Sequence, residues 1–150
     1  KGKFKLGDNV KFRPSSDVYI SWNVLLSIGD HTEIGNHSTI SVHNIVIIVK
    51  GATGPHVSIV DHNHEYRNPD VYIYKQGCRV GKDDRVLIDD GTWLGTNVVV
   101  VGNVYISKQC VIGANSVVTK DITDYCVATG SPAKVLKRYN FESKEWERLR

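Results

Sequence analysis

Residues 88–120 read IDDGTWLGTNVVVVGNVYISKQCVIGANSVVTK and contain a repeat six residues long. A bulky aliphatic residue recurs at every sixth position, at Ile88, Leu94, Val100, Ile106, Ile112 and Val118. This period matches neither an amphipathic helix, which repeats every 3.6 residues, nor a simple two-faced strand. The stretch therefore predicts a coil with flat sides, in which each hexapeptide supplies one short strand and one corner.

Three hexapeptides would complete one turn, so residues eighteen apart in the sequence should stack on each other. The predicted stacked pairs are Ile88 with Ile106, Leu94 with Ile112, and Val100 with Val118. Each coil would then bury its aliphatic side chains against the next coil, as in other solenoids. The Gly, Asn and Asp residues near the aliphatic positions tolerate the tight corners that such a coil needs.

The same repeat occurs earlier in the chain. Ile28, Ile34 and Ile40 follow it, and one extra residue shifts the inward positions to Ile47, Thr53 and Ile59, with Thr53 replacing the usual aliphatic residue. We predict one all-β domain over residues 1–150, with coils at about 22–64 and 86–130. An excursion loop should occupy 65–85. The tail, 134–150, should form a short helix, because Trp146 and Leu149 have helical spacing.

The amino-acid composition is that of a globular protein. Of 150 residues, 41% are apolar and 23% charged, as in ordinary globular proteins, and no apolar run is long enough to insert into a membrane. Cys78, Cys110 and Cys126 form no CxxC pair, which favours a reducing compartment such as the cytoplasm and positions in or near the core. The sequence contains no methionine, so we expect the natural N-terminus to lie upstream.

The net charge of +3 comes entirely from the tail. Residues 134–150 contain six basic and three acidic side chains, whereas residues 1–133 contain thirteen of each. A small basic end predicts an anionic ligand nearby, although a solvated surface would have the same composition. The patch is too small to predict nucleic-acid binding.

Three of the six histidines, His31, His37 and His43, are spaced by six residues. On a triangular coil, residues six apart lie on successive sides, so these imidazoles should point outward in three directions. We therefore predict corner or surface histidines and no metal site.

His62 and His64 differ from the other histidines because the repeat ends at them. The next inward residue should fall near 65, but the chain instead continues with about twenty residues that fit no repeat. A long excursion from a rigid scaffold commonly carries function. Histidine titrates near neutral pH, so an imidazole at the root of the excursion is suited to act as a general base.

Two stretches resemble a known family. Residues 91–138, GTWLGTNVVVVGNVYISKQCVIGANSVVTKDITDYCVATGSPAKVLKR, resemble the sugar O-acetyltransferases of the hexapeptide-repeat family, and DHNHEYRNP, residues 61–69, resembles their polysaccharide-type members. The resemblance spans roughly residues 22–138. It implies a left-handed parallel β-helix, a homotrimer, acetyl-CoA as co-substrate without a metal, and a sugar or glycan hydroxyl as acceptor, as in polysaccharide biosynthesis.

The resemblance also implies roles for individual residues. In the family the catalytic histidine follows an inward aliphatic residue by five positions, and Ile59 plus five is His64. From the residues themselves, His62 is the alternative, because it would share the side-chain parity of His64 on a strand. A neighbouring carboxylate, Asp61 or Glu65, would hold the tautomer of the catalytic ring. On the cofactor side the matching residues are Trp93 beside the pantetheine, Thr96, Ala114 and Thr119 along CoA, and Lys120, Lys134 and Lys137 near its phosphates.

Other functions remain compatible with the sequence. The same base could serve N-acetylation of an amino sugar, including a nucleotide-linked one, and a solenoid can also be a non-catalytic binding module. A gamma carbonic anhydrase has the same fold, but its zinc ligands include a histidine pair five positions apart, which this sequence lacks.

Overall fold

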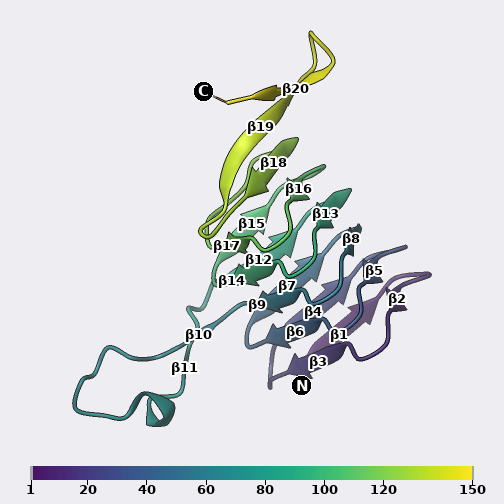
Figure 1. Cartoon of the computed structure of the whole chain (residues 1–150). Helices are drawn as coiled ribbons and strands as arrows, with labels where there is room; N and C mark the ends of the chain where they lie inside the picture. Colours follow the sequence, from purple (N-terminus) through teal and green to yellow (C-terminus); the bar gives the residue numbers. More distant parts are fainter. Residues whose placement is uncertain (1, 150) are drawn as a thin grey trace.

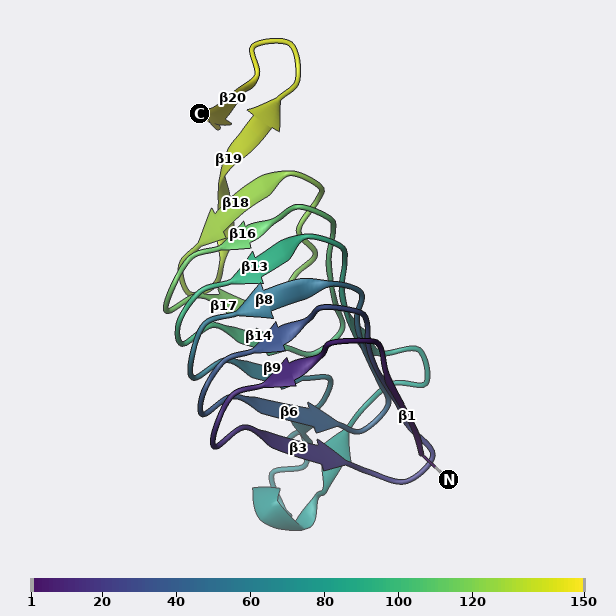
Figure 2. The same ribbon diagram turned by 90° about the vertical axis from the view of Figure 1, so that its right-hand side faces the viewer.

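The computed structural model describes residues 2–149, which form a triangular stack of parallel coils (Figures 1 and 2). Each coil contributes one short strand to each of three flat faces, called here faces A, B and C. The N-terminus lies near one end of the stack and the C-terminal strands lie beyond the other (Figure 1). Residues 2–149 include no helix with the length and apolar character needed to cross a membrane.

Every strand of the stack pairs in parallel with strands of the neighbouring coils. Face A contains β1 (Lys3–Leu6), β4 (Leu25–Ile28), β7 (Ile45–Ile48), β12 (Arg85–Ile88) and β15 (Val104–Ile106). Face B contains β2 (Lys11–Phe12), β5 (Glu33–Ile34), β8 (Gly51–Thr53), β13 (Thr92–Leu94), β16 (Val111–Ile112) and β18 (Cys126–Thr129). Face C contains β3 (Asp17–Ile20), β6 (Thr39–Val42), β9 (Ser58–Val60), β14 (Val99–Val101) and β17 (Val117–Val118).

The strand registers confirm the predicted stacking in the second half of the chain. The aligned pairs are Ile88 with Ile106, Leu94 with Ile112, and Val100 with Val118. All six side chains are buried in the interior of the prism. Burying an aliphatic side chain stabilises a fold by roughly 1.5–3 kcal/mol, so a repeat of such positions can stabilise the whole column.

The corners explain why the repeat can turn every six residues. Ten non-glycine corner residues adopt left-handed backbone angles: Asn9, Ser15, Asn23, His31, His37, His56, Asn97, Gln109, Asn115 and Tyr125. Four of them are asparagine, a residue enriched in this conformation. The coils also approach closely here: a Cβ built on Gly95 would lie 2.8 Å from the backbone nitrogen of Ala114. His31 and His37 are thus corner residues, as predicted.

Two details of the predicted coils are wrong. The coils begin at Lys3, not near residue 22, because β1, β2 and β3 pair with the second coil even though most of their side chains are exposed. Ile48, not Ile47, points inward and aligns with Ile88. Thr53 occupies an inward column as predicted, and its hydroxyl accepts a hydrogen bond from the backbone nitrogen of Gly35.

The predicted C-terminal helix is also wrong. Residues 134–149 form β19 (Lys134–Asn140) and β20 (Glu145–Arg148), an antiparallel hairpin that extends face B beyond the last coil (Figure 1). Tyr139 and Trp146 face each other across the hairpin with ring centroids 5.4 Å apart. A cross-strand aromatic pair stabilises a sheet, whereas two helix-spaced apolar residues give a short helix little to bury.

The excursion leaves the stack between β9 and β12, at the edge where face C leads into face A (Figure 1). It contains a short antiparallel ladder between β10 (Asn63–His64) and β11 (Cys78–Arg79), and a single 3₁₀ turn, η1 (Ile73–Lys75). Its tip extends away from the coils (Figures 1 and 2). The edge between faces C and A therefore carries the histidines that end the repeat.

Candidate active site

Asp61 is the structural centre of the site. It follows β9, is 0% exposed, and accepts hydrogen bonds from the backbone nitrogens of His43 (2.8 Å) and Asn44 (2.7 Å). Its carboxylate also lies 3.2 Å from Nδ1 of His62. A buried carboxylate needs such donors, because burying it without partners is costly. Asp61 therefore links two successive coils at the root of the excursion.

His62 lies against His43, with ring centroids 3.7 Å apart. The prediction that His43 points outward is wrong: it is only partly exposed and its ring lies inside the site. The physical reason is stacking, because one extra residue in this coil aligns His43 with His62, nineteen positions away, and the two rings then lie against each other. Burial, followed by the neighbouring His62, lowers the pKa of His43.

His64 lies two residues further on, in β10, opposite Cys78 in the ladder. It is exposed, whereas the His62 side chain is only 11% exposed. Within residues 2–149 the His64 ring makes no hydrogen bond or ion pair. A substrate can therefore reach the ring of His64, whereas the largely buried ring of His62 lies against Asp61 and His43.

Asn44 fixes the far end of the excursion to the same coil. Its side-chain nitrogen donates to the backbone oxygens of Lys82 (3.0 Å) and Asp84 (2.6 Å), and more weakly to Gly81. Asp61 holds the start of the excursion and Asn44 holds its end. The root is thus positioned more firmly than the tip.

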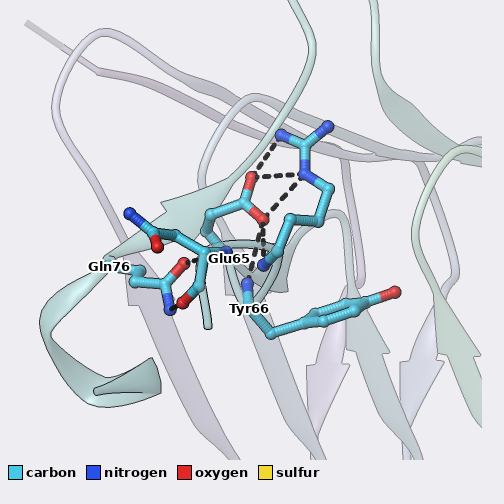
Figure 3. Close-up of polar contacts among 5 residues, drawn as sticks. Glu65, Tyr66 and Gln76 are labelled. Carbon is cyan, nitrogen blue, oxygen red and sulfur yellow. Dashed lines mark hydrogen bonds and ion pairs between the residues drawn. The ribbon is translucent and has the colours of Figure 1, made fainter. Parts of the chain in front are cut away.

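Glu65 does not contact either histidine. Its carboxylate binds the guanidinium and backbone nitrogen of Arg67, and it also accepts a hydrogen bond from the backbone nitrogen of Tyr66 (Figure 3). These bonds, with Arg67 first, lower the pKa of Glu65 to about 2. Gln76 bridges the two sides of the excursion through Asn68 (Figure 3). Glu65 therefore shapes the loop, and Asp61 is the carboxylate that orients an imidazole.

The space beside the root is small. A cavity of about 110 Å³ is lined by Asp61, His62, Asn63, Arg79, Asp84, Gly102 and Asn103. Sites for drug-sized ligands commonly measure about 300–1,000 Å³. This cavity cannot hold acetyl-CoA, so a complete site needs surface from outside it.

The residues predicted to contact the cofactor are spread over the molecule. Thr96 and Ala114 stack on successive coils at the corner between faces B and C, whereas Thr119 and Lys120 follow β17 on the edge that carries the histidines. Lys134 and Lys137 are exposed on β19. One chain therefore does not bring all of these residues together.

Trp93 lies on face B and is 48% exposed. With His31, Lys50 and Gln109 it lines a depression of about 400 Å³. Within residues 2–149, no ring contact or hydrogen bond joins Trp93 to His62 or His64. Trp93 thus lies on a different side of the same prism from the histidines.

His43, Asn44 and Cys78 also belong to the site, although they were not predicted from the sequence. The frame shift near Ile47 was the available signal, because it places residue 43 next to residue 62 once the correct register is used. No pattern in the sequence indicates the fold-back of Cys78, which depends on the path of the excursion.

Fold and site together define a hexapeptide-repeat β-helix with an interrupted coil. Residues 85–120 match the family described as "Bacterial transferase hexapeptide (six repeats)". Residues 85–120 are therefore similar to the hexapeptide-repeat transferases, and the coil of the chain is a left-handed parallel β-helix.

Curated relatives match most of the chain. It is 32% identical over 135 residues to a putative lipopolysaccharide biosynthesis O-acetyl transferase of Escherichia coli, a match covering 87% of this chain and 65% of that protein. It is 35% identical over 134 residues to a galactoside O-acetyltransferase of Lactococcus lactis, covering 89% and 55%. The chain thus spans less than two thirds of either relative.

Solved structures show the same fold. An N-acyltransferase from Bacillus cereus, solved with dTDP and 3-hydroxybutyryl-CoA, aligns with a TM-score of 0.72 at 14% identity, covering 95% of this chain and 79% of that one. A maltose O-acetyltransferase from Clostridium difficile aligns with a TM-score of 0.56 at 24% identity, covering 92% and 68%.

Proposed function

We propose that this protein transfers an acetyl group from acetyl-CoA to a hydroxyl of a sugar or glycan precursor. The observation that carries the proposal is an accessible histidine, His64, beside a buried carboxylate–histidine pair at the root of the excursion. The similarity to sugar O-acetyltransferases along most of the chain supports the same activity.

In the proposed reaction, His64 removes the proton from the acceptor hydroxyl as its oxygen attacks the thioester carbonyl of acetyl-CoA. Backbone N–H groups of a neighbouring coil would stabilise the oxyanion of the tetrahedral intermediate. Collapse breaks the carbon–sulfur bond, and the imidazolium returns the proton to the departing CoA thiolate. No covalent acetyl-enzyme forms, so no protein nucleophile is needed.

Acetyl-CoA consumption tests the proposal directly, over a panel of simple sugars, glycans, amino sugars and nucleotide sugars. We expect turnover with acceptors that offer only hydroxyls. Turnover confined to amino sugars would replace O-acetylation by N-acetylation. Absence of turnover across the panel would favour a binding solenoid without activity.

We further propose that this activity belongs to polysaccharide biosynthesis in the cytoplasm. Polysaccharide precursors are the expected acceptors, since one relative is a putative enzyme of lipopolysaccharide biosynthesis. All three cysteines are free thiols, which supports a reducing, cytoplasmic location.

We propose a homotrimer in which each site is shared between chains. The root cavity is too small for acetyl-CoA, and Trp93, Thr96 and Ala114 lie on other sides of the prism. Flat faces packed about a three-fold axis would bring the edge of one chain that carries His64 against a face of its neighbour.

Sedimentation or light scattering at micromolar concentration should therefore give three times the 16.8 kDa chain mass. An active particle with the mass of one chain would refute both the trimer and the shared site.

Lys134 and Lys137 on β19 are expected to contribute to the binding of acetyl-CoA. Replacing Lys134 and Lys137 together by alanine should raise KM for acetyl-CoA about tenfold and leave kcat nearly unchanged, since a remote phosphate contact contributes nearly equal binding to substrate and transition state. Steady-state kinetics would measure this change. Lys3 and Lys5, exposed on β1 at the other end of the stack, provide the matched double alanine control.

Acetyl-CoA lacking the ribose phosphate identifies what these lysines contact. In the wild type, removing the ribose phosphate should raise KM. In the double variant, it should raise KM by a smaller factor. Equal factors in the two proteins would show that the lysines do not contact this phosphate.

A further inference from the structure

Three side chains of the kinds that bind transition metals meet at the root of the excursion. His43, His62 and Cys78 each offer one ligand atom, and these atoms all lie within 4.8 Å of one another. The three residues come from separate segments: the corner after β6, the corner after β9, and β11. Only the return of the excursion brings Cys78 to the two histidines.

Asp61 orients His62 for such a role. The buried carboxylate lies 3.2 Å from Nδ1 of His62, which places the ring proton on Nδ1 and leaves the lone pair on Nε2. Metal-binding histidines almost always donate their second nitrogen to a carboxylate, a carbonyl or water in this way. His62 thus already has the arrangement of a metal ligand.

His43 provides the second nitrogen. Its Nδ1 is buried and has no hydrogen-bond partner among the described residues. Buried nitrogens without a partner are rare in native proteins, and a bound ion is one recognised explanation.

Cys78 provides the sulfur. It is exposed, whereas Cys110 and Cys126 are buried, and burial raises the pKa of the Cys110 thiol to about 11. Cys78 is therefore the accessible thiol of the chain. Two imidazoles with one thiolate favour a borderline or soft ion such as Zn²⁺ over Mg²⁺ or Ca²⁺, which prefer oxygen ligands.

We propose that His43, His62 and Cys78 bind one Zn²⁺ ion, which fastens the excursion to the coil. On binding, the Cys78 thiol loses its proton to solvent as the sulfur–zinc bond forms, and the ion loses water molecules. The acetyl transfer described above needs no metal. Because His64 lies opposite Cys78 in the ladder, a bound ion lies beside the proposed general base and inhibits the transfer; this consequence rests on the proposed function.

Cobalt titration tests the site without any assay of activity. The reduced, metal-free full chain should bind one Co²⁺ per chain and develop the near-ultraviolet charge-transfer band of a thiolate ligand, which added Zn²⁺ then removes. Cys78→Ser should abolish the band and weaken binding at least about tenfold. His31→Asn, at a corner that tolerates asparagine, should bind as the wild type does.

Two results would overturn the proposal: the absence of the thiolate band in the wild type, or an unchanged band and affinity in Cys78→Ser. His43→Ala provides an independent check, because it leaves the thiol in place and should still weaken binding. Equal affinity in His43→Ala and wild type would likewise refute the site.

Proteolysis tests the fastening of the excursion. Arg67 and Lys75 lie on its exposed part and are sites for trypsin. Zn²⁺ should slow cleavage there several-fold in the wild type and have no effect in Cys78→Ser. Equal cleavage of the wild type with and without Zn²⁺ would contradict the fastening.

An activity assay then tests the inhibition separately. Zn²⁺ should reduce acetyl transfer in the wild type and much less in Cys78→Ser. If the chain shows no transferase activity, the cobalt and trypsin results still decide whether the metal site exists.

Discussion

Replacing His64 by alanine is expected to lower kcat by a factor of about 10² to 10⁴, the usual contribution of a general base. The side chain is exposed and makes no hydrogen bond with the described residues, so its removal should leave the fold intact. Steady-state kinetics with a responsive acceptor would measure the loss, and circular dichroism would show whether the coils remain.

His62→Ala is the matched comparison, because the two histidines lie two positions apart at the root of the excursion. The His62 ring contacts Asp61 and His43, so its loss should disturb positioning and lower kcat less than His64→Ala does. If His62→Ala proves the more damaging change, then His62 is the base and the assignment to His64 is wrong.

Replacing Asp61 by alanine is expected to lower the free energy of unfolding by about 3–5 kcal/mol, the range for removing one partner of a buried charged interaction. The carboxylate is 0% exposed and accepts hydrogen bonds from the backbone nitrogens of His43 and Asn44. Alanine leaves both donors buried without a partner, and each such loss costs about 1–3 kcal/mol.

Urea unfolding would measure the change, with Asp83→Ala as the control, since Asp83 is exposed and lies at the end of the same excursion. The control should change stability by less than about 0.5 kcal/mol. A comparably small change in Asp61→Ala would show that the backbone donors find other partners and that Asp61 does not hold the two coils together.

The repeat made most of the fold predictable. In residues 88–120 the inward positions, the stacked pairs and the three faces all follow from the period of six. Near Ile47 the same reasoning failed by one residue. A single extra residue can be absorbed at any of several corners, and only the alignment of Ile48 with Ile88 decides which one.

The first coil and the tail were missed for related reasons. Phe4, Leu6 and Phe12 are exposed at the open end of the stack, so β1 and β2 lack the strict aliphatic spacing that marks a buried coil. In the tail, the pairing of Tyr139 with Trp146 depends on a turn between them. The spacing of apolar residues alone does not show whether such a cross-strand contact forms in place of a short helix.

The repeating core and the position of its interruption can be read from the amino-acid sequence alone, because burial of one aliphatic residue per six is a local property that recurs along the chain. The sequence also singles out His62 and His64. The partners of these histidines depend on the folded chain: Asp61 binds the backbone of the preceding coil, His43 lies against His62, and Cys78 returns from the excursion. These contacts join residues 16–35 positions apart, and the path of the chain between coils, which no local pattern encodes, brings them together.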